Sequence, residues 1–384
     1  MRVVIASHSG GLRGGAERCV LELAAALRAD GRVEPTVTVP LRGELSTALE
    51  QAQVPWRIAP TPTWLVDTSP PWPRDPLRAG RRTRRGLRVL SETPRWSAVL
   101  RETRPDVVMS STTTSPTPAL ASRRAGIPHV WWIHEFTTLG GQKRYALGEP
   151  ISQRLMGALS RRVAVNSNAV AHYYSPPIPA DKITLVELGV ETPVVAPNCV
   201  ATNRLRILML GRKDRAKGCE DAIRALASIR HEDLDVTLRM VGPSLPGYAE
   251  TLWYLARDLD VLDRVEFPEY VPDPREELSR SNVVLTCSAD EGFGRVAVEA
   301  MKGGRPVIGA RSGATVELIE DGFDGLLFEA GNTADIAAAI RRCAGDPGLV
   351  QTMSRNASVR NAERFTIAGE VDTFVDLFNE VHRG

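Results

Sequence analysis

The stretch from Asn282 to Gly304, NVVLTCSADEGFGRVAVEAMKGG, most constrains what this chain can fold into. It opens with apolar, mostly β-branched residues, Val283 to Thr286, which suit a strand buried in a parallel sheet. A polar turn follows, and from Phe293 the apolar residues take helical spacing until the breaker at Gly303. A strand, a glycine-bearing turn and a helix in this order offer backbone N–H groups to an anion.

Two carboxylates bracket this corner, Glu291 in the turn and Glu299 in the helix. A carboxylate can accept hydrogen bonds from neighbouring hydroxyls, such as those of a sugar or a ribose. An anion corner between two such groups favours a nucleotide-sugar site. The alternative without a binding function is that one glutamate complements the helix dipole and the other is solvated.

The rest of the chain alternates short apolar strands with helices. Residues 2–6 form a strand that leads into the glycine-rich loop 9–15 and then a helix ending near Gly31. The paired glycines are not the spaced dinucleotide fingerprint. Further strands are expected at residues 36–39, 107–110, 129–133, 162–166, 183–187, 206–210, 236–241, 265–267 and 306–310, with a hairpin-like segment at 325–328. The turn-rich residues 189–203 read as a linker between two such arrays.

Length and composition set further bounds. A chain of 384 residues is long for one hydrophobic core, which favours two domains. The net charge of +2 gives no global case for a nucleic-acid partner or for an anionic membrane. Five scattered cysteines without a C-x-x-C pair predict free thiols. No apolar run reaches 18 residues and the first is too short for a signal peptide, so we expect a cytoplasmic protein.

The ordered set of motifs resembles that of the retaining GT-B glycosyltransferases of family 4. Its hallmark is a pair of glutamates with seven residues between them around a Gly-Phe-Gly turn, as in residues 291–299. Matching segments lie at residues 14–18, 211–212, 217–218, 304–308, 317–319 and 322–327. The resemblance implies an α/β protein of the GT-B fold, with two Rossmann-like doubly wound domains facing a cleft. The domains would be 1–190 for the acceptor, 191–366 for the nucleotide sugar, and a C-terminal helix, 367–384, crossing back to the first.

The family's activity would be transfer of a sugar from a nucleoside-diphosphate sugar, with UDP or GDP as nucleotide, to a hydroxyl acceptor. A cell-envelope glycan, a lipid or a natural product would serve as acceptor. The resemblance implies four catalytic residues: His134, Glu291, Arg212 and Lys217. It implies as donor-binding residues Gly14, Gly15, Arg212, Lys217, Val271, Gly292, Phe293, Gly294, Arg295 and Glu299.

The residue types suit these roles. Negative charge accumulates on the diphosphate as the glycosidic bond breaks, and Arg212 and Lys217 supply positive charge from one loop. Without their matching context, two loop cations are more often solvated surface charges. His134 ends the strand 129–133, where ligands of open α/β sheets gather, and the family places this histidine against the donor sugar. A lone strand-end histidine is otherwise more often a satisfied core residue.

No residue stands out as a nucleophile for double displacement, and the family uses front-side substitution with the anomeric configuration retained. The D-x-D segments 233–235 and 258–260 lead into a strand and close a helix, so neither reads as a metal site. We expect no metal and no cofactor. The alternatives are a sugar-nucleotide epimerase or phosphorylase of the same fold, or a non-catalytic nucleotide-sugar binder. Donor hydrolysis without acceptor would separate an enzyme from a binder.

Residues 74–104 hold ten arginines, with Trp96 among them and Trp64 and Trp72 before them. The plain reading is a helix with a solvated basic face. The functional alternative is a platform for an anionic acceptor or a lipid headgroup, helped by the tryptophans, and thus a peripheral membrane contact through 74–104.

Overall fold

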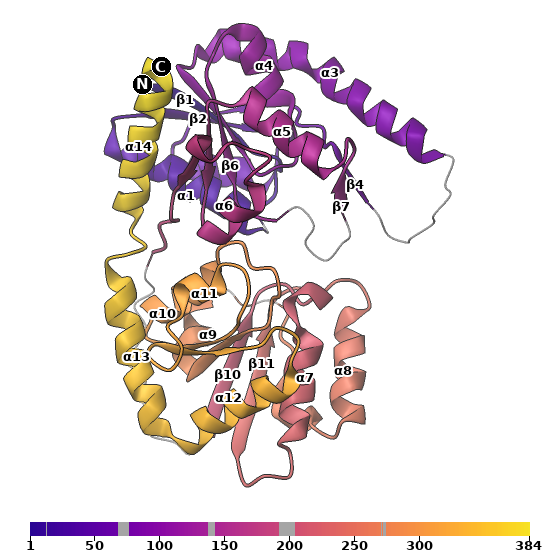
Figure 1. The fold of residues 1–384 in the computed structure, drawn as a ribbon, viewed down its shortest axis with the longest axis vertical. Coiled ribbons are helices and arrows are strands. Elements are labelled where there is room, and N and C mark those ends of the chain that lie inside the picture. The colour runs from indigo at the N-terminus through magenta and orange to yellow at the C-terminus, as the bar shows by residue number, and fades with distance from the viewer. Residues whose placement is uncertain (13, 68–76, 137–142, 192–203, 270, 272–273) are drawn as a thin grey trace. The chain divides into compact units, whose positions relative to one another are not determined.

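Each half of the chain folds around its own parallel sheet. The computed structural model describes residues 1–12, 14–67, 77–136, 143–191, 204–269, 271 and 274–384. The chain divides into two compact units, and each is described by itself. Unit 1 comprises Met1–Gly189 together with Ile367–Gly384, and unit 2 comprises Val190–Thr366 (Figure 1).

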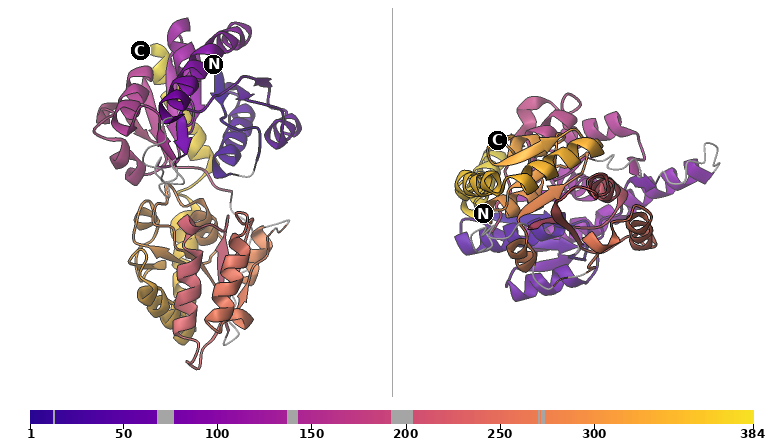
Figure 2. Two further views of the ribbon diagram at one scale, coloured as in Figure 1. Left: turned by 90° about the vertical axis from the view of Figure 1, so that its right-hand side faces the viewer. Right: turned by 90° about the horizontal axis from the view of Figure 1, so that it is seen from below.

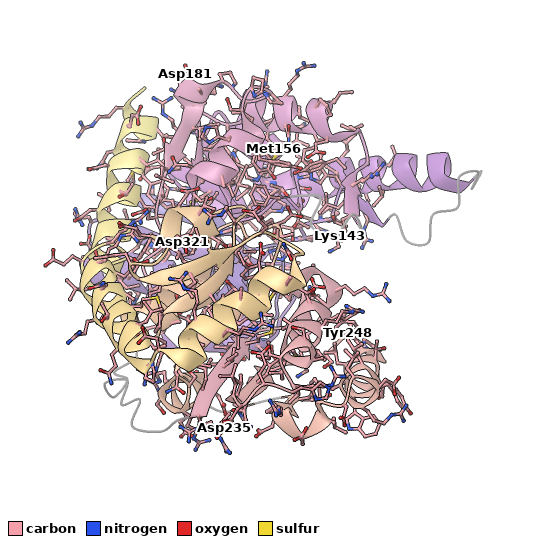
Figure 3. The ribbon with its side chains drawn as sticks, turned by 60° about the horizontal axis from the view of Figure 1, so that its bottom comes forward. Lys143, Met156, Asp181, Asp235, Tyr248 and Asp321 are labelled. Atoms are coloured by element: carbon pink, nitrogen blue, oxygen red, sulfur yellow. The ribbon has the colours of Figure 1, made fainter. Side chains whose placement is uncertain are left out.

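Unit 1 is built on a seven-stranded sheet in which every pair of neighbours is parallel. The strand order is β3-β2-β1-β5-β6-β8-β9. The strands are β1 (Arg2–Ala6), β2 (Glu34–Val39), β3 (Trp56–Ile58), β5 (Val107–Ser111), β6 (His129–Ile133), β8 (Arg162–Val165) and β9 (Ile183–Leu185). A small antiparallel pair, β4 (Leu65–Asp67) and β7 (Lys143–Tyr145), stands apart from this sheet. Met156 is fully buried in the unit 1 core (Figure 3).

The helices of unit 1 lie between its strands in the sequence, except for the C-terminal helix, which packs against the first helix. They are α1 (Gly15–Asp30), α2 (Glu44–Gln51), α3 (Leu77–Thr103), α4 (Thr117–Ala125), α5 (Glu149–Leu159), α6 (Asn168–Tyr174) and the C-terminal α14 (Ile367–Arg383), with a 3₁₀ turn at Ala180–Lys182. Within the described part of the chain, no helix is both long enough and apolar enough to cross a membrane.

Unit 2 has a six-stranded parallel sheet in the order β12-β11-β10-β13-β14-β15. The strands are β10 (Arg204–Leu210), β11 (Asp235–Val241), β12 (Val265–Glu266), β13 (Val283–Thr286), β14 (Val307–Ala310) and β15 (Gly325–Phe328). Counted within the unit this is the 3-2-1-4-5-6 order of a dinucleotide-type doubly wound sheet. The helices are α7 (Cys219–Ser228), α8 (Tyr248–Asp258), α9 (Pro274–Arg280), α10 (Arg295–Lys302), α11 (Thr315–Leu318), α12 (Thr333–Gly345) and α13 (Pro347–Ala362), with 3₁₀ turns at Arg215–Lys217 and Leu262–Arg264.

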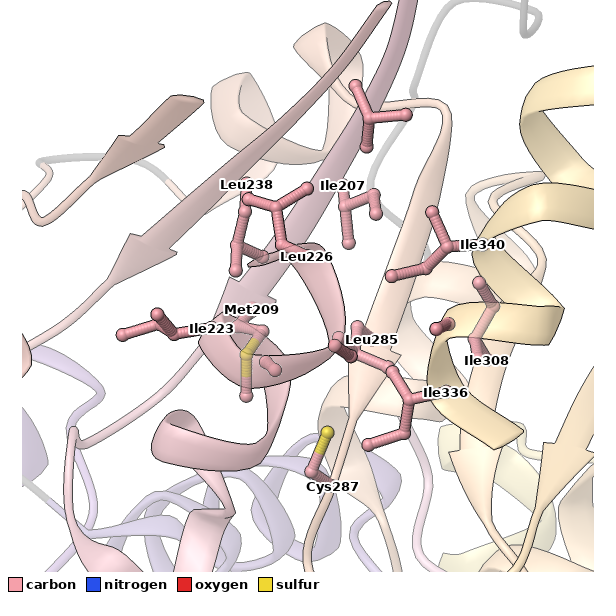
Figure 4. Packing of buried hydrophobic residues seen from close by; sticks show 14 of the residues in the cluster. Ile207, Met209, Ile223, Leu226, Leu238, Leu285, Cys287, Ile308, Ile336 and Ile340 are labelled. Atoms are coloured by element: carbon pink, nitrogen blue, oxygen red, sulfur yellow. The ribbon is translucent and has the colours of Figure 1, made fainter. Parts of the chain in front are cut away.

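The core of unit 2 forms between its sheet and the helices α7 and α12 (Figure 4). Ile207 and Leu285 from neighbouring strands meet Ile223 of α7 and Ile340 of α12, and all four are buried. The first strands read as near-continuous apolar runs because both faces of a parallel sheet are covered.

Residues 325–328 differ from expectation. The sequence suggested a hairpin-like segment, but β15 pairs parallel with β14 as the edge strand of the sheet. The intervening residues include α11, and a crossover helix brings the chain back in the same direction.

The tryptophans expected to help a surface platform are also different from expectation. Trp64 and Trp96 are buried, with 4% and 0% of their surface exposed. Each indole N–H finds a backbone acceptor, Trp64 donating to the carbonyl of Thr113 at 2.6 Å and Trp96 to that of Pro60 at 2.7 Å. A large ring whose only donor is satisfied is a core residue. Trp72 lies outside the described residues.

The chain passes between the units at two places, after Gly189 and after Thr366. On the unit 2 side, the buried ammonium of Lys302 donates to the carbonyls of Val190 at 2.7 Å and Phe365 at 2.8 Å. On the unit 1 side, the amide of Gly189 donates to Glu370 of α14 at 2.9 Å. The helix α14 lies along α1 within unit 1 (Figures 1 and 2).

His129 on β6 is buried as a neutral imidazole. Its ring nitrogens lie 2.8 Å from the hydroxyl of Ser110 and 2.9 Å from that of Ser160. Burial lowers the pKa of His129 to about 3. Because the folded pKa lies below the unfolded value, the unfolded chain binds the extra proton between these two pKa values, so stability falls as the pH falls.

We predict that replacing His129 by Gln flattens this pH dependence. The wild-type protein should lose about 2 kcal/mol more of its unfolding free energy than the variant on going from about pH 7 to about pH 5. Urea unfolding at both pH values measures the difference, with His172→Gln as control, since His172 is an exposed histidine of the same unit. Equal losses in wild type and His129→Gln would contradict the prediction.

Candidate active site

The two loops singled out by the sequence are neighbours at the switch point of the unit 2 sheet. Strands β10 and β13 are adjacent, and the chain leaves them toward opposite sides, to β11 and to β14. Loop 211–218 follows β10 and loop 287–294 follows β13. In open α/β sheets the crevice at the carboxyl ends of two such strands is where ligands bind.

Gly218 makes this close approach possible. Its φ is +65°, and a Cβ placed on it would lie 2.5 Å from the Cβ of Cys287 and 2.8 Å from its carbonyl oxygen. Both cysteines at this contact, Cys219 and Cys287, are buried free thiols. Glycine at 218 therefore serves both the left-handed backbone and the contact between the loops.

The contact joins Lys217 and Glu291. The ammonium of Lys217 lies 2.9 Å from a carboxylate oxygen of Glu291, with 42% and 23% of the two side chains exposed. The sequence had predicted separate roles for them, the cation at the diphosphate and the carboxylate at the sugar. The structure brings the two predicted ends of the donor site to one point.

Arg212 is held by a residue that the sequence analysis missed. Its guanidinium lies 2.6 Å from the carboxylate of Asp214, which is buried, while 63% of the Arg212 side chain is exposed. Asp214 also accepts from the amide of Lys217 at 3.1 Å and so caps the 3₁₀ turn. Its place three residues before Lys217 is a capping pattern that could have revealed it.

Lys213, between these residues, has a structural role. Its buried ammonium donates to the carbonyl of Pro268 at 2.8 Å and also to that of Gly242. Burial lowers the pKa of Lys213. The lysine thus fastens the loop after β10 to the ends of β11 and β12.

The turn before α10 is fixed from both sides. The Phe293 ring is buried and packs edge-on against Phe365 at 5.6 Å, so it positions the turn rather than lining a surface. The carbonyl of Glu291 accepts from the amide of Ala314 at 2.8 Å. Gly292 lies in this turn and Gly294 caps α10 without a side-chain hydrogen bond.

Glu299 is paired with Arg295 one helical turn earlier. Arg295 Nε lies 2.9 Å from Glu299 Oε1, and each side chain is about one-sixth exposed, at 17% and 16%. Arg295, which the sequence analysis named as a donor-binding residue, thus orients the carboxylate expected at the ribose. Val271 is half-buried after β12.

In unit 1, His134 ends up at the carboxyl edge of the sheet, one residue after β6. It is 9% exposed, its Nε2 lies 3.0 Å from the Ser111 hydroxyl, and its ring is tilted by 55° against that of Trp132, with the ring centroids 4.1 Å apart. Its Nδ1 is buried and has no partner among the described residues. Burial lowers the pKa of His134 to about 3, with His8 adding to the shift, so the ring is neutral at neutral pH.

Of the paired glycines of unit 1, only Gly14 lies closely against a neighbouring carboxylate. A Cβ on Gly14 would lie 2.3 Å from Glu17 Oε2, whereas one on Gly15 would meet nothing within 4 Å. Glu17 in turn lies 3.4 Å from Nε2 of His8. Burial lowers the pKa of His8 while Glu17 opposes that shift. The sequence analysis missed this pair, although Glu17 belongs to the motif at residues 14–18.

Solved structures share this architecture. HepE from Anabaena, in complex with UDP and glucose, matches 99% of this chain and 100% of its own with a TM-score of 0.79 at 23% identity. A sucrose-phosphate synthase from Thermosynechococcus elongatus matches 100% of this chain and 99% of its own with a TM-score of 0.73 at 20% identity. Two parallel-sheet α/β units with these neighbours define the GT-B fold, which confirms the fold expected from the sequence.

Family models and sequence relatives also match glycosyltransferases. The model described as Glycosyltransferase Family 4 matches residues 13–193, and that described as Glycosyl transferases group 1 matches residues 196–360. A D-inositol 3-phosphate glycosyltransferase of Acidothermus cellulolyticus is 34% identical over 68% of this chain and 64% of its own length. One of Corynebacterium kroppenstedtii is 31% identical over 65% and 62%. The chain belongs to the GT-B glycosyltransferases of family 4, and its match spans less than two thirds of these relatives.

The contact at Gly218 can be tested against a matched glycine. Gly247 also has a positive φ, +75°, but a Cβ there would meet nothing within 4 Å. Alanine at either position costs about 1–2 kcal/mol for the left-handed backbone. We predict that Gly218→Ala loses about 1–3 kcal/mol more than Gly247→Ala, because only Gly218 overlaps Cys287. Urea unfolding measures the loss of unfolding free energy in both variants, and equal losses would contradict the predicted overlap with Cys287.

Proposed function

We propose that the protein is a retaining glycosyltransferase that moves a sugar from a nucleoside-diphosphate sugar to a hydroxyl acceptor. The contact between Lys217 and Glu291 at the unit 2 switch point carries this proposal. A cation suited to a diphosphate lies against a carboxylate suited to sugar hydroxyls, and the bond between diphosphate and sugar is the one that must break. Family membership and the GT-B fold support the same reaction class.

The leaving group is stabilised by charges fixed to the protein. As the bond from the sugar to the diphosphate breaks, Lys217 and the exposed Arg212 meet the charge that develops on phosphate oxygens. The amino terminus of α10 adds a partial positive charge. Both cations are paired with carboxylates in this structure, so the diphosphate competes with Glu291 and Asp214 for them.

The transfer proceeds on one face of the sugar. The departing phosphate oxygen takes the proton of the acceptor hydroxyl, and the new glycosidic bond forms on the side from which the diphosphate leaves. The anomeric configuration is thus retained without a protein nucleophile. The neutral imidazole of His134, whose Nδ1 has no partner among the described residues, is a hydrogen-bonding group suited to a hydroxyl.

Glu299, oriented by Arg295, binds the ribose, and UDP is the first nucleotide to test. The solved neighbour HepE carries UDP and glucose. The matched relatives are named for D-inositol 3-phosphate, which makes a phosphorylated polyol the first acceptor to test. A panel of nucleotide sugars screened by thermal shift identifies the donor, because a ligand that binds only the folded protein raises its apparent stability.

Substitutions of Glu291 and Glu299 should affect different ligands. We predict that Glu299→Gln weakens UDP and UDP-sugar binding alike, by about 1–3 kcal/mol, since a charge-assisted bond to the ribose is lost. Glu291→Gln should lower turnover and leave UDP affinity little changed, because it faces the sugar.

Isothermal titration with UDP and turnover assays measure both effects. Glu250→Gln, an exposed carboxylate of the same unit, is the control. If both variants change UDP binding and turnover to the same extent, the division of roles is wrong.

Catalysis should need no divalent metal, because Arg212 and Lys217 supply the countercharge that Mg²⁺ or Mn²⁺ supplies elsewhere. Turnover in excess EDTA should equal turnover with added Mg²⁺. Lys217→Met should lower turnover by about 2.7–4 kcal/mol of transition-state stabilisation. Activity abolished by EDTA and restored by metal would overturn the roles of these two cations.

A further inference from the structure

The helix α8 presents an exposed aromatic face on one side of unit 2. It packs on α7, and Tyr248, Leu252 and Ala256 on its inner face are buried (Figure 1). On the opposite face Trp253 and Tyr254 are 42% and 51% exposed. Two large rings side by side in solvent form an apolar patch of the kind that marks an interaction site.

The two rings and a nearby arginine form one group. The ring centroids of Trp253 and Tyr254 lie 5.3 Å apart, with the ring planes at 85°. The guanidinium carbon of Arg257 lies 5.5 Å from the centroid of Trp253 and 4.8 Å from that of Tyr254. Trp, Tyr and Arg are the residue types that most often carry the binding energy of protein–protein interfaces. Because the rings stand almost at right angles, they do not form a flat platform on which sugar rings would stack. The group therefore favours a protein partner.

The charges beside the rings indicate which protein. The exposed Glu250 and Arg257 lie on either side of Trp253 and Tyr254, and the four residues form one stripe at helical spacing i, i+3, i+4 and i+7. The stripe reads acid, ring, ring, base, with equal spacing on both sides of its centre. A second α8 that runs antiparallel about a two-fold axis at this centre places Glu250 opposite Arg257 and Trp253 opposite Tyr254, each pair twice. The face is complementary in charge to itself.

This register is specific. With the axis between Trp253 and Tyr254, the remaining charge at this end of the helix, Asp258, lies opposite Ala249, so no like charges meet. An axis at Tyr254 itself would place Asp258 opposite Glu250, and the two carboxylates would repel each other.

Arg257 is available for a contact with a partner. Its Nη2 lies 2.7 Å from Oδ1 of the neighbouring Asp258, and 51% and 61% of the two side chains are exposed. A pair as solvated as this one contributes little, so a carboxylate of a second chain can compete for the guanidinium.

We propose that the outer face of α8 is the contact surface of a homodimer, in which two copies of the helix pack antiparallel about a two-fold axis. Closed symmetry of this kind gives a dimer and not a filament. One pair of helices buries an area at the low end of specific interfaces, so the dimer is weak and forms with rising protein concentration. The inference is independent of the proposed activity, since it uses no residue of the candidate active site.

Sedimentation velocity of the full chain from about 1 to about 100 µM measures the association. The wild type should pass from monomer to dimer as the concentration rises. Glu250→Arg and Arg257→Glu should each weaken dimerisation by at least about tenfold, because each places two pairs of like charges across the axis. Trp253→Ser/Tyr254→Ser should weaken it at least as much, because the rings form the centre of the contact.

A mixture of the two charge-reversed variants is the sharpest measurement. In a mixed dimer the substituted residue of each chain lies opposite its new counterion in the other chain, and the remaining Glu250–Arg257 pair is the natural one. The mixture should therefore dimerise about as strongly as the wild type, whereas each variant alone should not. Recovery in the mixture also shows that both variants are folded.

The matched controls are Arg355→Glu and Glu363→Arg, which reverse exposed charges at α13 of the same unit and should dimerise as the wild type does. Three results would overturn the proposal. The first is a wild type that stays monomeric over the whole range of concentrations. The second is a dimer that none of the α8 substitutions weakens, which would place the contact on another surface. The third is a mixture of the reversed variants that dimerises no better than either alone, which would exclude the antiparallel pairing of Glu250 with Arg257.

Discussion

The close approach of two loops at the unit 2 switch point is the constraint on which the candidate site depends. Gly218 and Cys287 meet where a side chain on residue 218 would not fit, and this contact carries Lys217 to Glu291. Three further contacts hold the two loops in place. Asp214 caps the 3₁₀ turn, Lys213 binds the loop after β10 to its neighbours, and Phe293 packs on Phe365. The groups of the candidate site are therefore placed by backbone packing.

The charges of this site are balanced in pairs. Arg212 pairs with Asp214, Lys217 with Glu291, and Arg295 with Glu299. A bare cluster of cations would repel itself in the absence of ligand, and pairing avoids that cost at modest strength because these pairs are partly solvated. Under the proposed function, a diphosphate that takes over Lys217 releases Glu291, whose carboxylate is then free to accept hydroxyls of the same donor molecule.

Much of the fold could be predicted from the sequence, and the predictions that were wrong or missing have physical reasons. Strands such as β6 and β13 were found at their observed bounds because parallel strands buried on both faces read as apolar runs. The strand 325–328 was mistaken for a hairpin because a short apolar run does not reveal its partner. The pairing of Lys217 with Glu291 joins residues 74 positions apart, and local spacing carries no information on such a contact. Trp64 and Trp96 looked like surface groups among arginines, but the carbonyls that satisfy their N–H groups lie at distant positions.

The assignment of α14 to unit 1 bears on how such proteins can recombine. Phe374 of α14 packs against Trp132 of the unit 1 sheet, and Glu370 binds the amide of Gly189. A gene fusion that exchanged everything after the linker would therefore exchange part of the first core as well. An exchange of unit 2 between relatives that preserves both cores needs two crossover points, at Gly189 and at Thr366. Lys302 and the two carbonyls that it binds, those of Val190 and Phe365, all lie within unit 2, so this contact at the chain crossings would move with the exchanged unit.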